Sequence, residues 1–204
     1  MADKLNDLNG VLLQGHIKIH NPETGEVLID KRNAIHYENM SISLAESLGN
    51  GGTGWIYEMA FGNGGTSVDP TGIITYLTPN STGTNASLYN QTYSKVVDDR
   101  SVNNLDPIRN KIETRHVSGT NYTDILVSCL LDYGEPNGQD AFDNATDETS
   151  SYIFDELGLR AYSAAGTGRL LTHVIFHPVQ KSLNRLIQVN YTVRVQSLSG
   201  FNEV

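Results

Sequence analysis

Two histidines four residues apart, His173 and His177, are the residues whose type and spacing most resemble a metal site. The run around them, residues 170–177, is rich in aliphatic and β-branched side chains, which is typical of a strand. Four residues along a strand separate side chains by roughly 13 Å, whereas two nitrogen ligands of one zinc ion lie about 3 to 4 Å apart. We therefore expect these histidines to pack or hydrogen-bond, and we predict no metal ligands.

Carboxylates are dense in the second half of the chain and raise the question of calcium. The residues concerned are Asp132, Asp140, Asp143, Asp147, Glu148, Asp155 and Glu156. No window has the Asp, Asn and Gly offsets of the twelve-residue calcium loop, and nothing singles out a carboxylate pair for glycoside hydrolysis. We interpret residues 134–151 as a solvated acidic loop, with structural calcium as the less favoured alternative.

Neither a nucleotide site nor an activated nucleophile is indicated. Residues 49–54 match G-x-G-x-x-G, but a predicted helix precedes them and a predicted strand follows, which reverses the order that pyrophosphate binding requires. There is no G-x-S-x-G elbow. The single cysteine, Cys129, alternates with Val127 and Leu131, as a small core residue would. We predict that the protein is not an enzyme and has no cofactor.

The clearest structural element is residues 185–196, where apolar and polar residues alternate. The apolar positions are Ile187, Val189, Tyr191, Val193 and Val195. Period-two alternation predicts a strand with one buried and one wetted face. Such a strand needs neighbours on both flanks and a second layer over its apolar face.

Other segments supply those partners. Residues 12–20 and 26–30 flank a turn at 21–25 and predict a hairpin. From about Asn33 the spacing becomes helical, which predicts one amphipathic helix ending at Gly49. Its predicted core face is Tyr37, Met40 or Ser41, Leu44, Ala45 and Leu48. Further strands are predicted at 55–61, 111–117, 124–132 and 170–177, and ordered structure is expected to resume at 88–97.

Together these elements predict an all-β fold, an antiparallel β-sandwich of jelly-roll-like form with one amphipathic helix packed on it and long loops. A chain of 204 residues fits one domain. We expect a flexible N-terminus at 1–10, a single β-rich domain at 11–198 with loops at 62–90 and 134–151, and a tail at 199–204. Long loops in compact domains are usually functional or contact a partner.

Charge and hydropathy exclude several partner classes. Fourteen Lys and Arg against 23 Asp and Glu give a net charge of -9, and the basic residues are scattered, so we expect no nucleic-acid partner. No run approaches eighteen apolar residues, so no membrane partner is expected. Residues 1–10 lack a signal-peptide core, which indicates synthesis in a cytoplasm. No small-molecule substrate is predicted.

Three glycine-rich or leucine-led segments resemble small β-rich virion proteins of tailed bacteriophages. The segments are EMAFGNGG at 58–65, LYNQTY at 88–93 and FDELGL at 154–159, followed by a closing strand. In this order they are similar to the N-terminal attachment domain of tail fibres and baseplate-type proteins. The opening, residues 15–35, resembles that of phage structural proteins of similar size. Fibres continue into a repetitive shaft, whereas this sequence stops at Val204, so the resemblance implies a stand-alone component.

The resemblance implies a structural component of the virion: a tail, baseplate or neck/collar ring, with the anchoring of fibres as one role, made in the host bacterial cytoplasm. It would dock onto other phage structural proteins and onto copies of itself in a symmetric oligomer. The alternatives are a carbohydrate-binding β-sandwich module, which would stack sugars on Trp55 and exposed tyrosines, and a capsid decoration protein. An enzyme is the third option, with His173 and Asp132 as its main candidates.

The predicted contact residues lie in or beside the long loops. Aromatic residues with a polar end are favoured at interfaces. The candidates are Trp55, Gly62, Asn63, Tyr76, Tyr89, Tyr93, Tyr122 and Asp143.

Overall fold

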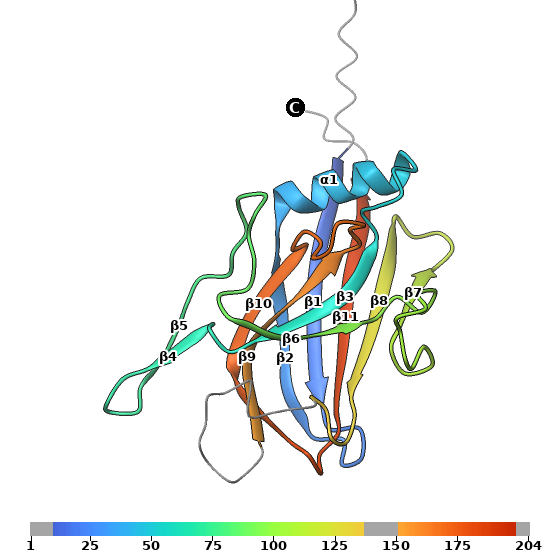
Figure 1. Cartoon of the computed structure of the whole chain (residues 1–204). Coiled ribbons are helices and arrows are strands. Elements are labelled where there is room, and N and C mark those ends of the chain that lie inside the picture. The colour runs from blue at the N-terminus through green and yellow to red at the C-terminus, as the bar shows by residue number, and fades with distance from the viewer. Residues whose placement is uncertain (1–9, 137–150, 199–204) are drawn as a thin grey trace, which may run out of the picture.

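The computed structural model describes residues 10–136 and 151–198, and all structural statements below concern these residues. The chain folds into one large curled antiparallel sheet, a small two-stranded sheet and one helix (Figure 1). The predicted all-β, sandwich-like fold is confirmed. The elements are β1 Gly10–His20, β2 Val27–Ile35, α1 Tyr37–Leu48, β3 Ile56–Gly62, β4 Thr66–Val68, β5 Ile74–Tyr76, β6 Gln91–Val96, β7 Lys111–His116, β8 Tyr122–Leu131, β9 Ser151–Ala161, β10 Thr172–Ser182 and β11 Ile187–Leu198.

The nine strands of the large sheet run in the order β6-β3-β9-β10-β2-β1-β11-β8-β7. The two layers of the sandwich are the halves of this one sheet. They are joined where β10 pairs with β2 at only two positions, Thr172 with Ile35 and His173 with Ala34. Because this junction is so short, the sheet can fold over and bury the inner faces of both halves against each other.

Strand β11 lies inside one half, paired over residues 188–198 with β1 and over residues 187–196 with β8. Its residues Ile187, Val189, Tyr191 and Val193 are buried, whereas the residues between them are half-buried or exposed. The alternation in the sequence therefore predicted both the strand and its inner face. Cys129, on β8 opposite Val189, is also buried in the core, as predicted.

The hairpin β1–β2 also forms as predicted. The Asn21 side chain accepts hydrogen bonds from the amides of Glu23 and Thr24, and Gly25 has a φ of 75°. These bonds turn the chain back within five residues. Strand β2 continues to Ile35, past the predicted end at residue 30.

Helix α1 lies across one end of the sandwich, but its start and its buried face differ from the prediction. It begins at Tyr37, because the His36 ring caps it by accepting a hydrogen bond from the Asn39 amide. The buried residues are Asn39, Met40 and Ser43, whereas Tyr37 and Leu48 are largely exposed. The predicted face was therefore right in part: Met40 is buried and Leu44 packs against the core, whereas the two ends of the predicted face do not reach it.

Strand β9 was not predicted from periodicity, because most of it is buried on both faces. The core residues of β9 are Tyr152 and Phe154 in its first half and Leu157 and Leu159 in its second half. The inward-facing positions therefore change from even to odd numbers along the strand. Its outer face is covered by the segment between β3 and β6. A strand covered on both sides shows no alternation of apolar and polar residues. In the described part of the chain, no helix is long and apolar enough to cross a membrane.

Candidate functional site

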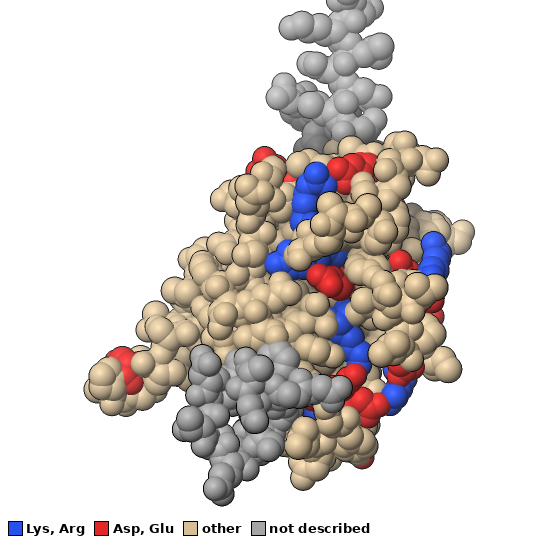
Figure 2. Space-filling view, viewed as in Figure 1, with Lys and Arg blue, Asp and Glu red and all other residues tan. Residues whose placement is uncertain are grey.

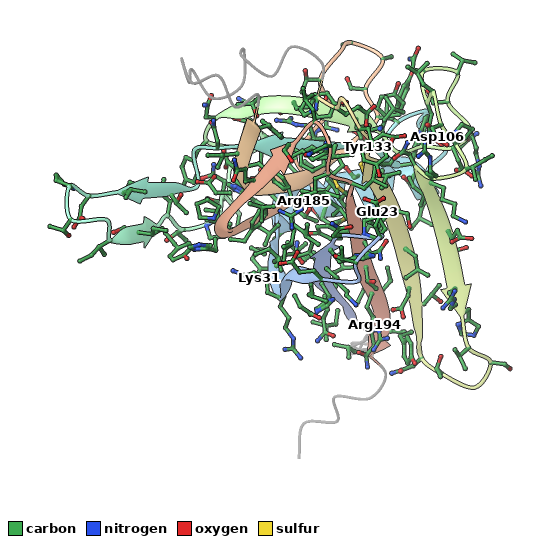
Figure 3. The ribbon with its side chains drawn as sticks, turned by 90° about the horizontal axis from the view of Figure 1, so that it is seen from below. Glu23, Lys31, Asp106, Tyr133, Arg185 and Arg194 are labelled. Atoms are coloured by element: carbon green, nitrogen blue, oxygen red, sulfur yellow. The ribbon has the colours of Figure 1, made fainter. Side chains whose placement is uncertain are left out.

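The segment between β3 and β6, residues 63–90, forms an arm that carries the β4–β5 hairpin. The hairpin projects from the side of the domain in Figure 1, and the view from below in Figure 3 shows the same projection. The predicted long loop is therefore a defined arm. Its end is closed by Asp69, whose carboxylate accepts hydrogen bonds from the amides of Thr71 and Ile73 at 2.8 and 3.0 Å.

Two buried carboxylates on β9 hold the base of the arm. Asp155 accepts hydrogen bonds from the amides of Gly65 and Thr66 at 2.9 and 2.8 Å. Its Oδ2 also accepts a bond from the Thr66 hydroxyl. Asp155 therefore fixes the point where the chain leaves β3 and enters β4.

Glu156 holds both ends of the arm at once. Its Oε1 accepts hydrogen bonds from the amides of Gly64 and Asn90, at 3.1 and 2.8 Å, and its Oε2 accepts one from the amide of Tyr89 at 3.0 Å. Burial raises the pKa of Glu156. The bonds from His173 and these three amides outweigh that effect and hold the pKa below its usual value.

His173 completes this network in its neutral form. Its Nδ1 accepts a hydrogen bond from the Asn80 amide at 2.8 Å, so the proton is on Nε2, which donates to Glu156 at 2.9 Å. His177 lies outside the network and contacts the Tyr76 hydroxyl at 3.2 Å. The two histidines therefore have separate structural partners, and both help to seat the arm.

Beyond its base, the arm exposes apolar side chains. The exposed apolar residues of the arm are Val68, Ile73, Tyr76 and Leu77. Asp69 is the only charged residue between 63 and 90, and in the space-filling view the projecting arm is tan except for red near its end (Figure 2). An apolar surface on a well-anchored projection is typical of a protein contact.

A cavity of about 980 Å³ opens between the two layers beside α1. Aliphatic side chains from both layers and from the helix line its interior: Leu13, Met40, Leu44, Ile56, Ile125 and Val193. The Ser43 hydroxyl is buried in this lining and has no hydrogen-bond partner within the described chain. The cavity is large enough to accept several side chains of a partner.

Aromatic residues stand at the mouth of the cavity. Trp55 stacks on Tyr162 with ring centroids 4.5 Å apart and planes 7° from parallel, and its Nε1 donates to Asp98 at 3.0 Å. Trp55 remains 40% exposed. Tyr57 packs edge-on against the same tyrosine. The Trp55 side chain is therefore held in place while part of it stays open to a partner.

The loop between β6 and β7, residues 97–110, borders the same mouth and carries three strongly exposed aliphatic residues. Val102, Leu105 and Ile108 are 94%, 97% and 81% exposed. Buried amides stiffen the loop: Asn104 donates to the carbonyl oxygens of Asp98 and Asn110. We define the cavity mouth together with residues 97–110 as the cavity face.

The arm and the cavity face lie on opposite sides of the domain. In Figure 1 the arm projects to the left, and β7 with its preceding loop lies on the right. Figure 3 agrees, with Asp106 of the loop labelled on the side away from the arm. One domain thus presents two separate apolar surfaces.

The predicted contact residues divide into four groups. Trp55, Tyr76 and Tyr89 are exposed and therefore available for contact. That they contact a partner stays a prediction. Gly62 is buried against Glu156 and is not available for contact. Asn63, Tyr93 and Tyr122 are half-buried; the Tyr122 ring lies 3.9 Å from the Arg194 guanidinium. Asp143, like most of the predicted loop at 134–151, lies outside the described residues.

The residues with possible chemistry are used structurally where the structure describes them. Asp132 pairs with Arg109 at 2.5 Å, and burial raises the pKa of the Cys129 thiol to about 12. Within residues 10–136 and 151–198, no three His, Cys, Asp or Glu side chains are grouped so that they could hold a metal ion.

Sequence reasoning missed the cavity face. No contact surface was predicted at residues 98–110, although the aliphatic residues of this segment lie between Asn, Asp and Pro without any periodic pattern. Aliphatic residues in such a turn-rich segment cannot all reach a core, and that was the available signal.

Comparisons of the chain with protein-family models, with curated proteins and with solved structures find no match. The resemblance to phage tail-fibre attachment domains therefore stays a prediction.

Proposed function

We propose that this protein is a structural subunit of a tailed-phage particle that acts by docking, with the arm of one copy seated on the cavity face of the next. The observation that carries the proposal is the presence of two exposed apolar surfaces on opposite sides of one domain. The phage assignment rests on the resemblance of the sequence segments alone, and a tail, baseplate or neck ring is the preferred location.

The arm is suited to be inserted because it is anchored before any partner arrives. Glu156 and Asp155 fix its base, and the Asp69 turn fixes its end. A pre-ordered projection loses less conformational entropy on binding than a flexible loop does. Its exposed aliphatic residues can then enter an apolar cavity with little reorganisation.

The cavity face is suited to receive a protein segment. Its interior is aliphatic, and Val102, Leu105 and Ile108 extend the apolar surface beyond the mouth. A small ligand would fill the interior but leave those three residues in water. A protein partner covers both, so a macromolecular occupant is favoured.

One charged contact between the arm and the cavity face can be proposed. Arg100, on the rim of the cavity, is exposed and makes no ion pair within the described chain. The arm carries one charge, the negative Asp69. Because Asp98 and Asp99 line the same cavity, the face has no net positive charge, and an Asp69–Arg100 contact would set the register of docking without general attraction.

Two different surfaces on opposite sides make a head-to-tail interface. Repeated copies of such an interface close into a ring when the rotation between neighbours is suitable. A ring of stiff β-sandwiches is the kind of part that the resemblance implies.

The test uses exposed residues, so that the variants fold. Ile73→Asp in the arm and Val102→Asp on the cavity face should each lower the assembly constant at least about tenfold, since each places a carboxylate in an apolar contact. Val11→Asp, on β1 and 63% exposed against 62% for Ile73, is the matched control. The readouts are sedimentation equilibrium and the emission of Trp55, the single tryptophan, which should shift to the blue on assembly. A wild-type chain that stays monomeric at every concentration, or variants that assemble normally, would refute head-to-tail docking.

The second candidate is a carbohydrate-binding module. The partly exposed Trp55 ring, held by Tyr162 and Asp98, is the observation in its favour. Such a module should remain a monomer and be retained on a glycan column, and Trp55→Ala should abolish that retention.

A further inference from the structure

A second cavity, of about 530 Å³, lies where the arm returns to the domain, next to the turn between β9 and β10. It is separate from the cavity face, and its wall is mostly polar. The polar side chains that line it are Thr84, Asn85, Ser87, Arg160, Thr167 and Arg169. Hydroxyl, amide and guanidinium groups therefore surround a space that is too polar for an aliphatic ligand.

Arg160 is the unusual member of this set. It is only 4% exposed, and its Nη1 donates to the carbonyl oxygen of Gly168 at 2.8 Å. Its Nε is buried without a hydrogen-bond partner, and no carboxylate of the described residues forms an ion pair with it. Buried arginines are almost always paired, because an isolated buried charge is costly.

The nearest carboxylate influence on Arg160 comes from its cross-strand neighbour Glu58. Burial lowers the pKa of Arg160, and the charge of Glu58 only partly offsets this without an ion-pair contact. Arginine side chains stay charged at neutral pH in proteins, so the guanidinium keeps its positive charge here. A fixed positive charge thus lies beside the cavity without a direct counter-ion among the described residues.

The second arginine is already neutralised. Arg169 donates from Nη1 to both carboxylate oxygens of Glu46 on α1, at 2.9 and 3.0 Å. This pair ties the helix to the β9–β10 turn beside the cavity. The charge that lacks a counter-ion is therefore that of Arg160.

We infer that this cavity binds an oxyanion, a phosphate, sulfate or carboxylate group, on Arg160. The planar guanidinium presents parallel N–H donors that match such groups, and hydroxyls of the cavity wall can supply further donors. The chain has a net charge of -9, so its overall charge repels anions. Binding of an anion in this cavity would therefore depend on the local charge of Arg160. The inference does not depend on the proposed docking function.

Thermal unfolding with inorganic phosphate or acetate tests the inference. At constant ionic strength, replacing chloride by either anion should raise the midpoint of unfolding by several degrees and in a saturable manner, because a ligand that binds only the folded state stabilises it. Broadening of the phosphorus-31 resonance of phosphate by substoichiometric protein should show the same site directly. No saturable effect of either anion on the wild-type chain would overturn the inference.

Replacement of Arg160 could prevent folding, so the decisive variants lie at the cavity wall. Thr84→Glu adds a carboxylate to the wall of the cavity that Arg160 also lines and should abolish both the stabilisation and the line broadening. Thr82→Glu adds the same charge to the same exposed stretch, at a position that does not line the cavity, and should preserve both. Equal loss in both variants, or equal retention in both, would overturn the inference.

Discussion

Glu156 is the residue on which the position of the arm depends most, because it receives hydrogen bonds from both arm ends and from His173. Glu156→Gln should loosen the arm and lower the free energy of unfolding by roughly 1–3 kcal/mol, since an amide turns one acceptor into a donor that faces buried N–H groups. Hydrogen exchange of the arm amides measures the loosening. Glu38→Gln, on the exposed side of α1, is the control; equal protection of the arm in both variants would contradict this role.

The lowered pKa of Glu156 predicts that the stability of the arm depends on pH. Because the folded pKa of Glu156 lies below its ordinary value of about 4.3, its stabilising contribution is present above that pH. It is lost as the pH falls through the lowered folded value. The protection factors of the arm amides, which compare the measured exchange rate with the intrinsic rate at the same pH, should therefore fall on acidification in the wild-type chain, and this particular step should be missing in Glu156→Gln. An unchanged step in the variant would assign it to another carboxylate.

Cys129 should be inert in the native protein. Burial raises the pKa of its thiol to about 12, so almost no thiolate exists at pH 8 and reagents cannot reach the sulfur. A thiol reagent at pH 8 should label the chain only after denaturant is added. Rapid labelling of the folded chain would show that β8 opens to solvent.

At the scale of elements, β9 depends on close approach to its neighbours. Gly158 faces the carbonyl oxygen of Thr172 so closely that a Cβ atom would collide with it. Gly158→Ala should lower the free energy of unfolding by about 1–3 kcal/mol, as overpacking does, measured by urea denaturation. Gly10→Ala, where the nearest atom lies 3.8 Å from the added carbon, should be close to neutral; equal effects would mean that β9 relaxes freely.

Elements with one wet face were predictable from the sequence, and elements with none were not. Strand β11 alternates because its outer residues, such as Asn190, meet water. Strand β9 is covered by the arm, and its buried Asp155 and Glu156 resemble a surface segment when read in sequence. The arm was predictable only as a long loop, because its order comes from hydrogen bonds to residues about 90 positions away.

The candidate site was less predictable than the fold. Trp55, Tyr76 and Tyr89 were expected at contacts and are exposed. The cavity could not be predicted, because its lining comes from α1 and from strands distant in sequence that meet only after the sheet curls. The unpaired charge of Arg160 could not be predicted either, because nothing in the neighbouring sequence indicates that it lacks a carboxylate partner in the described residues.

At the scale of the whole molecule, the account requires two different surfaces, and salt should affect their contact. If Asp69 of one copy lies near Arg100 of the next, Arg100→Glu should weaken assembly, and added salt should weaken wild-type assembly more than it weakens the variant. Sedimentation equilibrium at two salt concentrations measures both effects. Arg32→Glu, an exposed arginine on β2, is the control; equal weakening in both would indicate only a general effect of charge.

The most direct measurement mixes an arm variant with a cavity-face variant. Ile73→Asp keeps an intact cavity face, and Val102→Asp keeps an intact arm, so each alone should be a monomer. Head-to-tail docking predicts that the equimolar mixture, weighed by native mass spectrometry, contains a heterodimer with one copy of each variant and nothing larger. A mixture that stays monomeric while the wild-type chain assembles, or variants that each assemble alone, would contradict the account.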